Sequence, residues 1–195
     1  MKSVLYDWGG LNLWLFHAIN DLRSAWLDAF ILFGSWLGDP DRFWLFLALA
    51  LLFAWRGGVA HDGARGRAWR ITLVVFVLGY GLDGLLVHGL KLWLDFPRPP
   101  LALPAASLHI VGEAVFRRSL PSGHAAFAML VAASFWPRAN RPVRLLLAGF
   151  ALWVGLSRVS LGAHFPADVI AGWLLAFGVV RLLYRLVAPC CPRNG

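Results

Sequence analysis

Ser157-Arg-Val-Ser-Leu-Gly-Ala-His-Phe-Pro-Ala-Asp168 places ionisable side chains inside an otherwise apolar part of the chain. His164 and Asp168 lie one helical turn apart, and Arg158 stands six residues before the histidine. Ionisable groups at the edge of a hydrophobic span are energetically costly, so they usually mark a functional site. The stretch therefore indicates a membrane boundary and a site at that boundary.

The composition around this stretch is typical of a membrane protein. The chain has 195 residues, of which 59% are hydrophobic and 14% charged, and its mean hydropathy is +0.67. Several spans of about 20 apolar residues use nearly all of this length, so we expect one all-α integral membrane domain over residues 1–195. The net charge of +8 is better explained by basic loops beside apolar spans than by nucleic-acid binding.

The apolar runs predict a bundle of six transmembrane helices, preceded by an interfacial helix over 11–20 that mixes Leu, Trp and Phe with polar residues. Arg23 and Asp28 are awkward within the first crossing, because charged side chains are costly inside a membrane. The expected crossings cover 22–37, 43–55, 71–94, 122–136, 145–161 and 167–187.

Charge predicts which side of the membrane each connection faces. The loops over 56–70 and 138–144 are basic, as is the tail with Arg193, so these segments fall on the cytoplasmic side. The segment 95–121 and the link 162–166 then lie on the external side. Five prolines prevent 95–121 from forming one continuous helix, and a loop of that length is usually functional.

Three basic side chains at the external edge depart from this charge pattern, namely Lys91, Arg98 and Arg158. They supply positive charge and hydrogen-bond donors suited to the oxygens of a phosphate. Ser122 and Gly123 begin the fourth predicted crossing and offer free backbone N–H groups at the positive end of a helix dipole. The sequence therefore predicts an anion cradle at this edge.

Two histidines, His124 and His164, lie at the same edge. A phosphoryl transfer needs an in-line nucleophile and a proton donor for the leaving oxygen. Asp168, four residues after His164 on one helical face, can fix the tautomer of that imidazole and stabilise its positive charge. These residues form a candidate phosphoryl-transfer site.

Three motifs now occur in order along the chain. Residues 91–99 read K-x6-R-P, residues 121–124 read P-S-G-H, and residues 157–168 read S-R-x5-H-x3-D. Together they resemble the signature motifs of the type-2 phosphatidic acid phosphatase superfamily, which also includes vanadium haloperoxidases. Every specified position is present. The motifs cover the third predicted crossing to the start of the sixth, and the six-helix layout is typical of the integral-membrane members.

The resemblance implies a role for each motif residue. His164 would be the nucleophile that forms a phosphohistidine, with Asp168 as its orienting partner. His124 would protonate the leaving group and then activate water. The phosphate and its transition state would be held by Lys91, Arg98, Ser122, Gly123 and Arg158. The family works without a metal or other cofactor, so we expect none here.

The resemblance also implies a lipid phosphate substrate, membrane lipids as neighbours, and a place in a bacterial inner membrane with the site facing the periplasm. Small members of this kind commonly hydrolyse undecaprenyl diphosphate, which is our first expected substrate. Phosphatidylglycerophosphate, phosphatidic acid and lipid A phosphates are alternatives, as is transfer of the phosphate to a second lipid. A transporter or scaffold with an inactive site is disfavoured by the complete motifs. The oligomeric state stays open.

Several polar residues outside the motifs have structural explanations of equal or greater weight. Arg117 and Arg118 could contact a second phosphate or anionic lipid head groups, or be solvated charges. We expect Asp83 to serve helix packing and His88 to be satisfied by a helix neighbour. The adjacent cysteines at 190 and 191 match neither a disulfide nor a metal pattern.

Overall fold

The computed structural model describes residues 6–59 and 63–188, so the cysteines at 190 and 191 and Arg193 lie outside the described residues. Within those residues the fold is helical and no strand occurs, which confirms the all-α prediction. The helices are α2 (Leu11–Asn20), α3 (Ala25–Leu37), α4 (Phe43–Arg56), α5 (Ala64–Leu94), α6 (Pro99–Ala102), α7 (Gly123–Phe135), α8 (Arg141–Ser160) and α9 (Pro166–Val187). Short 3₁₀ turns are η1 (Trp8–Gly10), η2 (Pro40–Arg42), η3 (Ala105–Ser107) and η4 (Trp136–Arg138).

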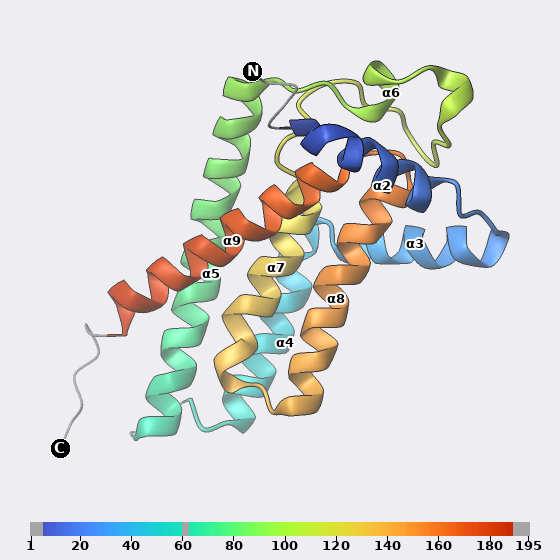
Figure 1. Cartoon of the computed structure of the whole chain (residues 1–195). Coiled ribbons are helices and arrows are strands. Elements are labelled where there is room, and N and C mark those ends of the chain that lie inside the picture. Colours follow the sequence, from blue (N-terminus) through green and yellow to red (C-terminus); the bar gives the residue numbers. More distant parts are fainter. Residues whose placement is uncertain (1–5, 60–62, 189–195) are drawn as a thin grey trace.

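Helix α7 lies at the centre of the bundle, in contact with α5, α8 and α9 (Figure 1). It is rich in alanine, and most of its residues are buried. Small side chains let neighbouring helices approach closely. One close approach is at Gly172 of α9, where a Cβ atom would lie 2.5 Å from the carbonyl oxygen of Ser122. The start of α9 is therefore packed directly against the start of α7.

Aromatic side chains fill the part of the core between α4, α5 and α7. Phe43 of α4 stacks on Phe76 and Tyr80 of α5, with ring centroids 5.3 Å and 4.0 Å apart. Phe46 and Phe127 meet edge to face, an arrangement that aromatic rings favour. This cluster anchors the beginning of α4, and hence the turn that precedes it, on the core of the bundle.

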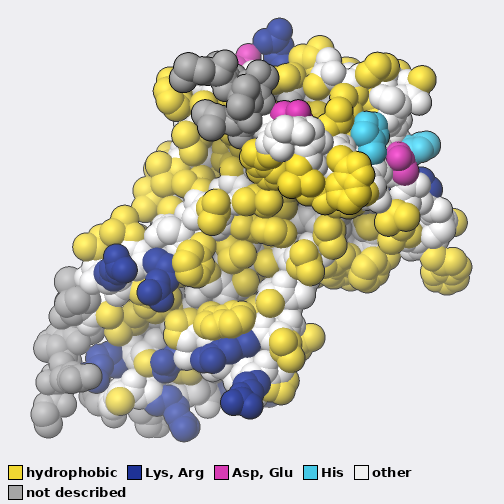
Figure 2. Space-filling model, viewed as in Figure 1, with side chains coloured by type: hydrophobic (Ala, Val, Ile, Leu, Met, Phe, Trp, Pro, Cys, Tyr) yellow, Lys and Arg dark blue, Asp and Glu magenta, His cyan; other side chains and the backbone are white. Residues whose placement is uncertain are grey.

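The outer surface has the character of a membrane protein. Three helices are long and apolar enough to cross a bilayer by length and composition, namely α5, α8 and α9, in the part of the chain that is described. Figure 2 shows hydrophobic side chains over the middle of the molecule, with Lys and Arg gathered toward its lower end. That end carries the basic connection between α7 and α8, which includes η4, and the connection before α5.

The structure does not confirm the predicted first crossing over 22–37. Helix α3 has 13 residues, so it is about 20 Å long. Both of its ends also contact the same end of α8: Arg23 donates to the carbonyl oxygen of Ser160 at 2.8 Å, and Ser35 accepts from Arg158. Figure 1 accordingly shows α3 running across the direction of α8.

The segment between α5 and α7 contains only the short elements α6 and η3, as its prolines predict. It is tied down at several points rather than extended into solvent. Asn20 donates to the carbonyl oxygen of His109 at 2.8 Å and accepts from its N–H at 2.8 Å. Ser119 donates its N–H to the carbonyl oxygen of Phe96 at 2.9 Å. The segment therefore covers the end of the bundle at which α7 begins and α8 ends.

Candidate active site

Residues from five parts of the chain meet at the upper end of the bundle in Figure 1. The end of α5, the start of α7, the end of α8 and the start of α9 all lie there, as does the segment 95–121. Because antiparallel neighbours place their connections at alternating ends, this arrangement brings all three sequence motifs together. The convergence predicted from the motif order is the arrangement that the fold adopts.

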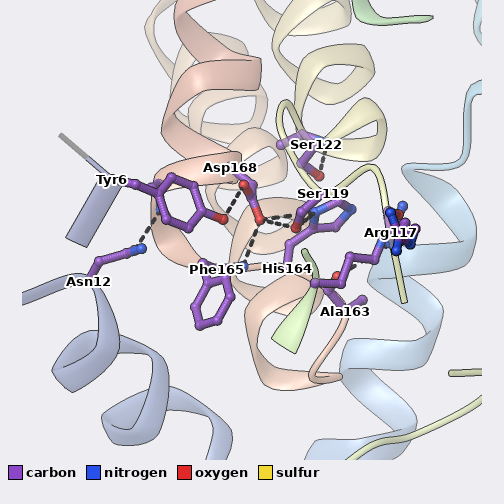
Figure 3. A network of polar contacts seen from close by, with 12 residues as sticks. Tyr6, Asn12, Arg117, Ser119, Ser122, Ala163, His164, Phe165 and Asp168 are labelled. Atoms are coloured by element: carbon purple, nitrogen blue, oxygen red, sulfur yellow. Dashed lines mark hydrogen bonds and ion pairs between the residues drawn. The ribbon is translucent and has the colours of Figure 1, made fainter. Parts of the chain in front are cut away.

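His164 and Asp168 form the buried centre of this site (Figure 3). His164 lies in the link between α8 and α9, and Asp168 lies in the first turn of α9. The imidazole Nδ1 is 3.3 Å from Asp168 Oδ2. His164 is 1% exposed and Asp168 is fully buried. Since Nδ1 faces the carboxylate, Nε2 is the ring nitrogen that remains for a substrate.

Asp168 has further partners that sequence reasoning missed. Its Oδ2 accepts from the Ser119 hydroxyl and, at 2.9 Å, from the Phe165 N–H. Its Oδ1 accepts from the hydroxyl of Tyr6 at 2.8 Å. Ser119 also lies 3.4 Å from His164 Nδ1. A carboxylate with this many donors is fixed in position, so the imidazole beside it is fixed as well.

Ser119 could have been suggested by a sequence pattern, whereas Tyr6 could not. Ser119 stands two positions before the P-S-G-H motif, so proximity to a motif could have suggested it. Tyr6 is 162 residues away from Asp168, and no spacing rule connects them. The neighbouring Asn12 accepts from the N–H of Ala167 at 2.9 Å. The amino-terminal segment therefore supports the first turn of α9 from outside.

The pKa of His164 lies well below its ordinary value of 6.5. The largest cause is burial, which disfavours the charged ring, and the positive charges of Arg98, Arg158 and Lys91 act in the same direction. Lowering the pKa keeps the imidazole neutral at pH 7. A neutral ring has a free electron pair on Nε2, as a nucleophile requires.

A pH titration followed by nuclear magnetic resonance tests this state. In detergent-solubilised protein with ¹⁵N-labelled histidine, we expect the His164 ring to stay neutral as the pH falls through 6.5, and to take up a proton only at clearly lower pH. The signal that disappears in His164→Ala identifies the ring. A titration midpoint at 6.5 or above would contradict the electrostatic account of this site.

The predicted phosphate ligands Arg98 and Arg158 are held rigidly beside this centre. Arg98 is 9% exposed, and it donates through Nε to the carbonyl oxygen of Arg117 at 3.0 Å and through Nη1 to that of Ala163 at 3.3 Å. Arg158 donates through Nη1 to Ser35, while its buried Nε has no hydrogen-bond partner among the described residues. Both guanidinium groups keep donors for an anion.

The other predicted ligands occupy the same region. Lys91 interacts electrostatically with Arg98, Asp168 and Arg158. Ser122 is buried and caps α7, since its hydroxyl accepts from the N–H of Ala125 at 3.5 Å. The hydroxyl is thus engaged in the helix start. The first N–H groups of α7, beginning at Gly123, lack intrahelical acceptors, as at every helix start.

His124 lies on the first turn of α7 and belongs to this cluster. Its ring interacts electrostatically with His164 and with Arg98, Arg158 and Lys91. Its Nε2 lies 3.7 Å from Oδ2 of Asp39, a residue of the turn between α3 and α4. Sequence reasoning did not connect Asp39 with the site, because that turn precedes the first motif by about 50 residues.

The remaining polar residues differ in exposure and in their partners. Arg117 forms an exposed ion pair with Asp95 at 3.0 Å, and its carbonyl oxygen supports Arg98. Asp83 is 4% exposed within α5, and His88 is exposed on the same helix. Among residues 6–59 and 63–188, no group of three histidine, cysteine or acidic side chains could hold a metal ion.

Comparisons with known proteins bear on this constellation. A family model described as the PAP2 superfamily matches residues 72–190, a range that contains all three motifs. Lipid A 1-phosphatase of Rhizobium johnstonii is 44% identical over 174 residues, covering 79% of this chain and 66% of that protein. Undecaprenyl-diphosphatase of Sulfolobus acidocaldarius is 31% identical over 169 residues, covering 85% of this chain and 73% of that protein.

The fold has a solved counterpart. The crystal structure of Aquifex aeolicus LpxE superimposes with a TM-score of 0.74 at 26% identity, over 90% of this chain and 95% of that one. The chain spans 49% and 66% of the lengths of two lipid A 1-phosphatases that it matches.

Proposed function

Because this chain belongs to the PAP2 superfamily, we propose that it is a membrane phosphatase that hydrolyses a lipid phosphate through a phosphohistidine intermediate. The observation that carries this proposal is the buried His164–Asp168 pair, with Nδ1 on the carboxylate and Nε2 free. Around it stand three cations and a helix start that suit a phosphate.

In the first step Nε2 of His164 attacks phosphorus, and the bond from phosphorus to the leaving oxygen breaks. Asp168 accepts a hydrogen bond from Nδ1–H and stabilises the positive charge that the ring acquires. His124 donates a proton to the leaving oxygen, so the lipid departs as a neutral alcohol or as a phosphate. The phosphoryl group remains on His164.

In the second step water attacks phosphorus, and the bond between phosphorus and Nε2 breaks. His124, now neutral, accepts a proton from the water as it attacks. His164 returns to its starting state and inorganic phosphate is released. Both steps spread negative charge over the phosphoryl oxygens, and the donors of Arg98, Arg158 and Lys91 stabilise that charge.

We propose that five helices cross the membrane, namely α4, α5, α7, α8 and α9. Helices α4 and α7 are short, with 14 and 13 residues, and local thinning of the bilayer accommodates such helices. The basic connections before α5 and around η4 then lie in the cytoplasm. The site faces the opposite side, which is the periplasm in a bacterial inner membrane.

For the substrate, we place the 1-phosphate of lipid A first. The support is the 44% identity to lipid A 1-phosphatase of Rhizobium johnstonii, compared with 31% to the undecaprenyl-diphosphatase. This order differs from the sequence prediction, which put undecaprenyl diphosphate first. The motif residues bind the phosphoryl group shared by all these lipids, so they do not choose among them.

A substrate panel tests the function. Purified protein in detergent is assayed for phosphate release from lipid A, undecaprenyl diphosphate, phosphatidylglycerophosphate and phosphatidic acid, with His164→Ala as control. We expect metal-independent release, highest with lipid A and with loss of its 1-phosphate. A labelled product on an added acceptor lipid, in place of free phosphate, would identify a phosphotransferase. Absence of both products with every lipid would overturn the proposal.

A further inference from the structure

The turn between α3 and α4 brings a second carboxylate to the site, next to the second histidine. Asp39 Oδ2 lies 3.7 Å from Nε2 of His124, and the two side chains are 37% and 23% exposed. This distance is within ion-pair range when the ring is protonated. Hydrogen bonds of catalytic groups are often long before substrate binds and shorten in the complex.

Asp39 is held in place independently of this contact. Its Oδ1 accepts from the N–H of Asp41 at 2.9 Å and so caps η2. The carbonyl oxygen of Pro40 accepts from the hydroxyl of Tyr80 at 3.3 Å, which ties the turn to α5. Because one carboxylate oxygen is used by the turn, the other is presented to His124 in a fixed direction.

The charges that face His124 make a carboxylate at this position important. Lys91 at the end of α5, Arg98 in the following segment, Arg158 on α8 and the ring of His164 all interact with it. Positive charges oppose protonation of an imidazole, yet the first chemical step requires a proton on His124. Asp39 is the carboxylate in contact with the ring, and it also interacts with Arg158.

We propose that Asp39 is a positioning residue that orients His124 and stabilises its protonated form for donation to the leaving group. This inference rests on the proposed phosphatase function and deepens it. With Nε2–H directed at Asp39, the proton at Nδ1 is the one that moves to the leaving oxygen. The neutral ring left behind keeps Nε2–H, so Nδ1 can accept the proton from water in the second step.

The turn offers a matched pair of variants. Asp39→Asn keeps a side-chain oxygen that can cap η2 but removes the charge beside His124. Asp41→Asn removes one negative charge from the same turn. Its side chain is exposed, and its N–H, which donates to Asp39, is retained. The two variants therefore differ in the contact with His124 and not in the local change of net charge.

The measurement is kcat/KM for two substrates that depend differently on a general acid. A lipid phosphate monoester has an alkoxide leaving group that must be protonated, whereas p-nitrophenyl phosphate has a leaving group that departs without a proton. For Asp39→Asn we expect kcat/KM to fall by about 10- to 100-fold with the lipid and by less than about threefold with p-nitrophenyl phosphate. For Asp41→Asn we expect the ratio of the two values to match the wild type.

Each outcome separates the positioning role from the other possibilities. An equal loss with both substrates in Asp39→Asn, or no loss with either, overturns the positioning role. So does an equal change of the ratio in Asp41→Asn. If the wild-type protein releases no phosphate from either substrate, the proposed phosphatase function itself fails, whatever the variants do. Thermal unfolding of both variants checks that the turn and the bundle stay folded.

Discussion

Substitution of His164 by alanine is expected to abolish phosphate release from every lipid phosphate, with a loss of roughly 10⁴-fold or more. Nε2 of His164 is the nitrogen in the buried centre that is free to attack phosphorus, because Nδ1 faces Asp168. Alanine removes that nucleophile and leaves the cations in place. The measurement is single-turnover and steady-state release of phosphate from the best substrate of the panel.

The phosphoenzyme gives a second measurement. Wild-type protein quenched in base during turnover of a ³²P-labelled lipid should carry label on histidine, and His164→Ala should carry none. His88→Ala is a suitable control, since this exposed histidine of α5 lies outside the site. Label that persists in His164→Ala, or activity near the wild-type level, would show that another group is the nucleophile.

Replacement of Asp168 by asparagine is expected to lower kcat by about 10²–10⁴-fold with a smaller effect on KM. The carboxylate accepts from Tyr6, Ser119 and Phe165 and faces His164. An amide group cannot accept at both ends, so one donor loses its acceptor. The substitution also removes the negative charge that stabilises the imidazole ring once His164 carries the phosphoryl group.

The same substitution should destabilise the fold, by about 1–3 kcal/mol for a buried donor left without a partner. Tyr6→Phe is the matched control, because it removes one donor to Asp168 and leaves the carboxylate intact. We expect Tyr6→Phe to lower kcat by less than about tenfold. Asp168→Asn activity within threefold of the wild type would contradict the orienting role of this carboxylate.

Most of the site could be predicted from the sequence because its chemistry is concentrated in three local motifs. Lys91 and Arg98, Ser122 to His124, and Arg158 to Asp168 each lie within short stretches whose residue types and spacing are informative. The prediction that these stretches meet at one end of the bundle followed from the expected alternation of helix directions. The structure has this alternation in α5, α7, α8 and α9, which carry or flank the motifs.

The orientation of α3 could not be predicted from its sequence. Hydrophobicity alone made 22–37 look like a crossing, although α3 lies across the bundle and both of its ends contact α8 near the site. An apolar run of that length suits a helix lying at the membrane surface as well as a crossing. Its charged residues carried the relevant signal, since Arg23 pairs with Asp28 at 3.3 Å.

The sequence by itself determined the membrane character, the helical class and the identity of the eight motif residues, because composition, periodicity and short spacing are local properties of a chain. Only the tertiary structure decided which groups support them. Tyr6 and Ser119 fix Asp168, and Asp39 faces His124, through contacts between residues 49 to 162 positions apart in the sequence. The physical reason is that packing of α7 against α9 and of α3 against α8 sets those distances, and no local pattern encodes them.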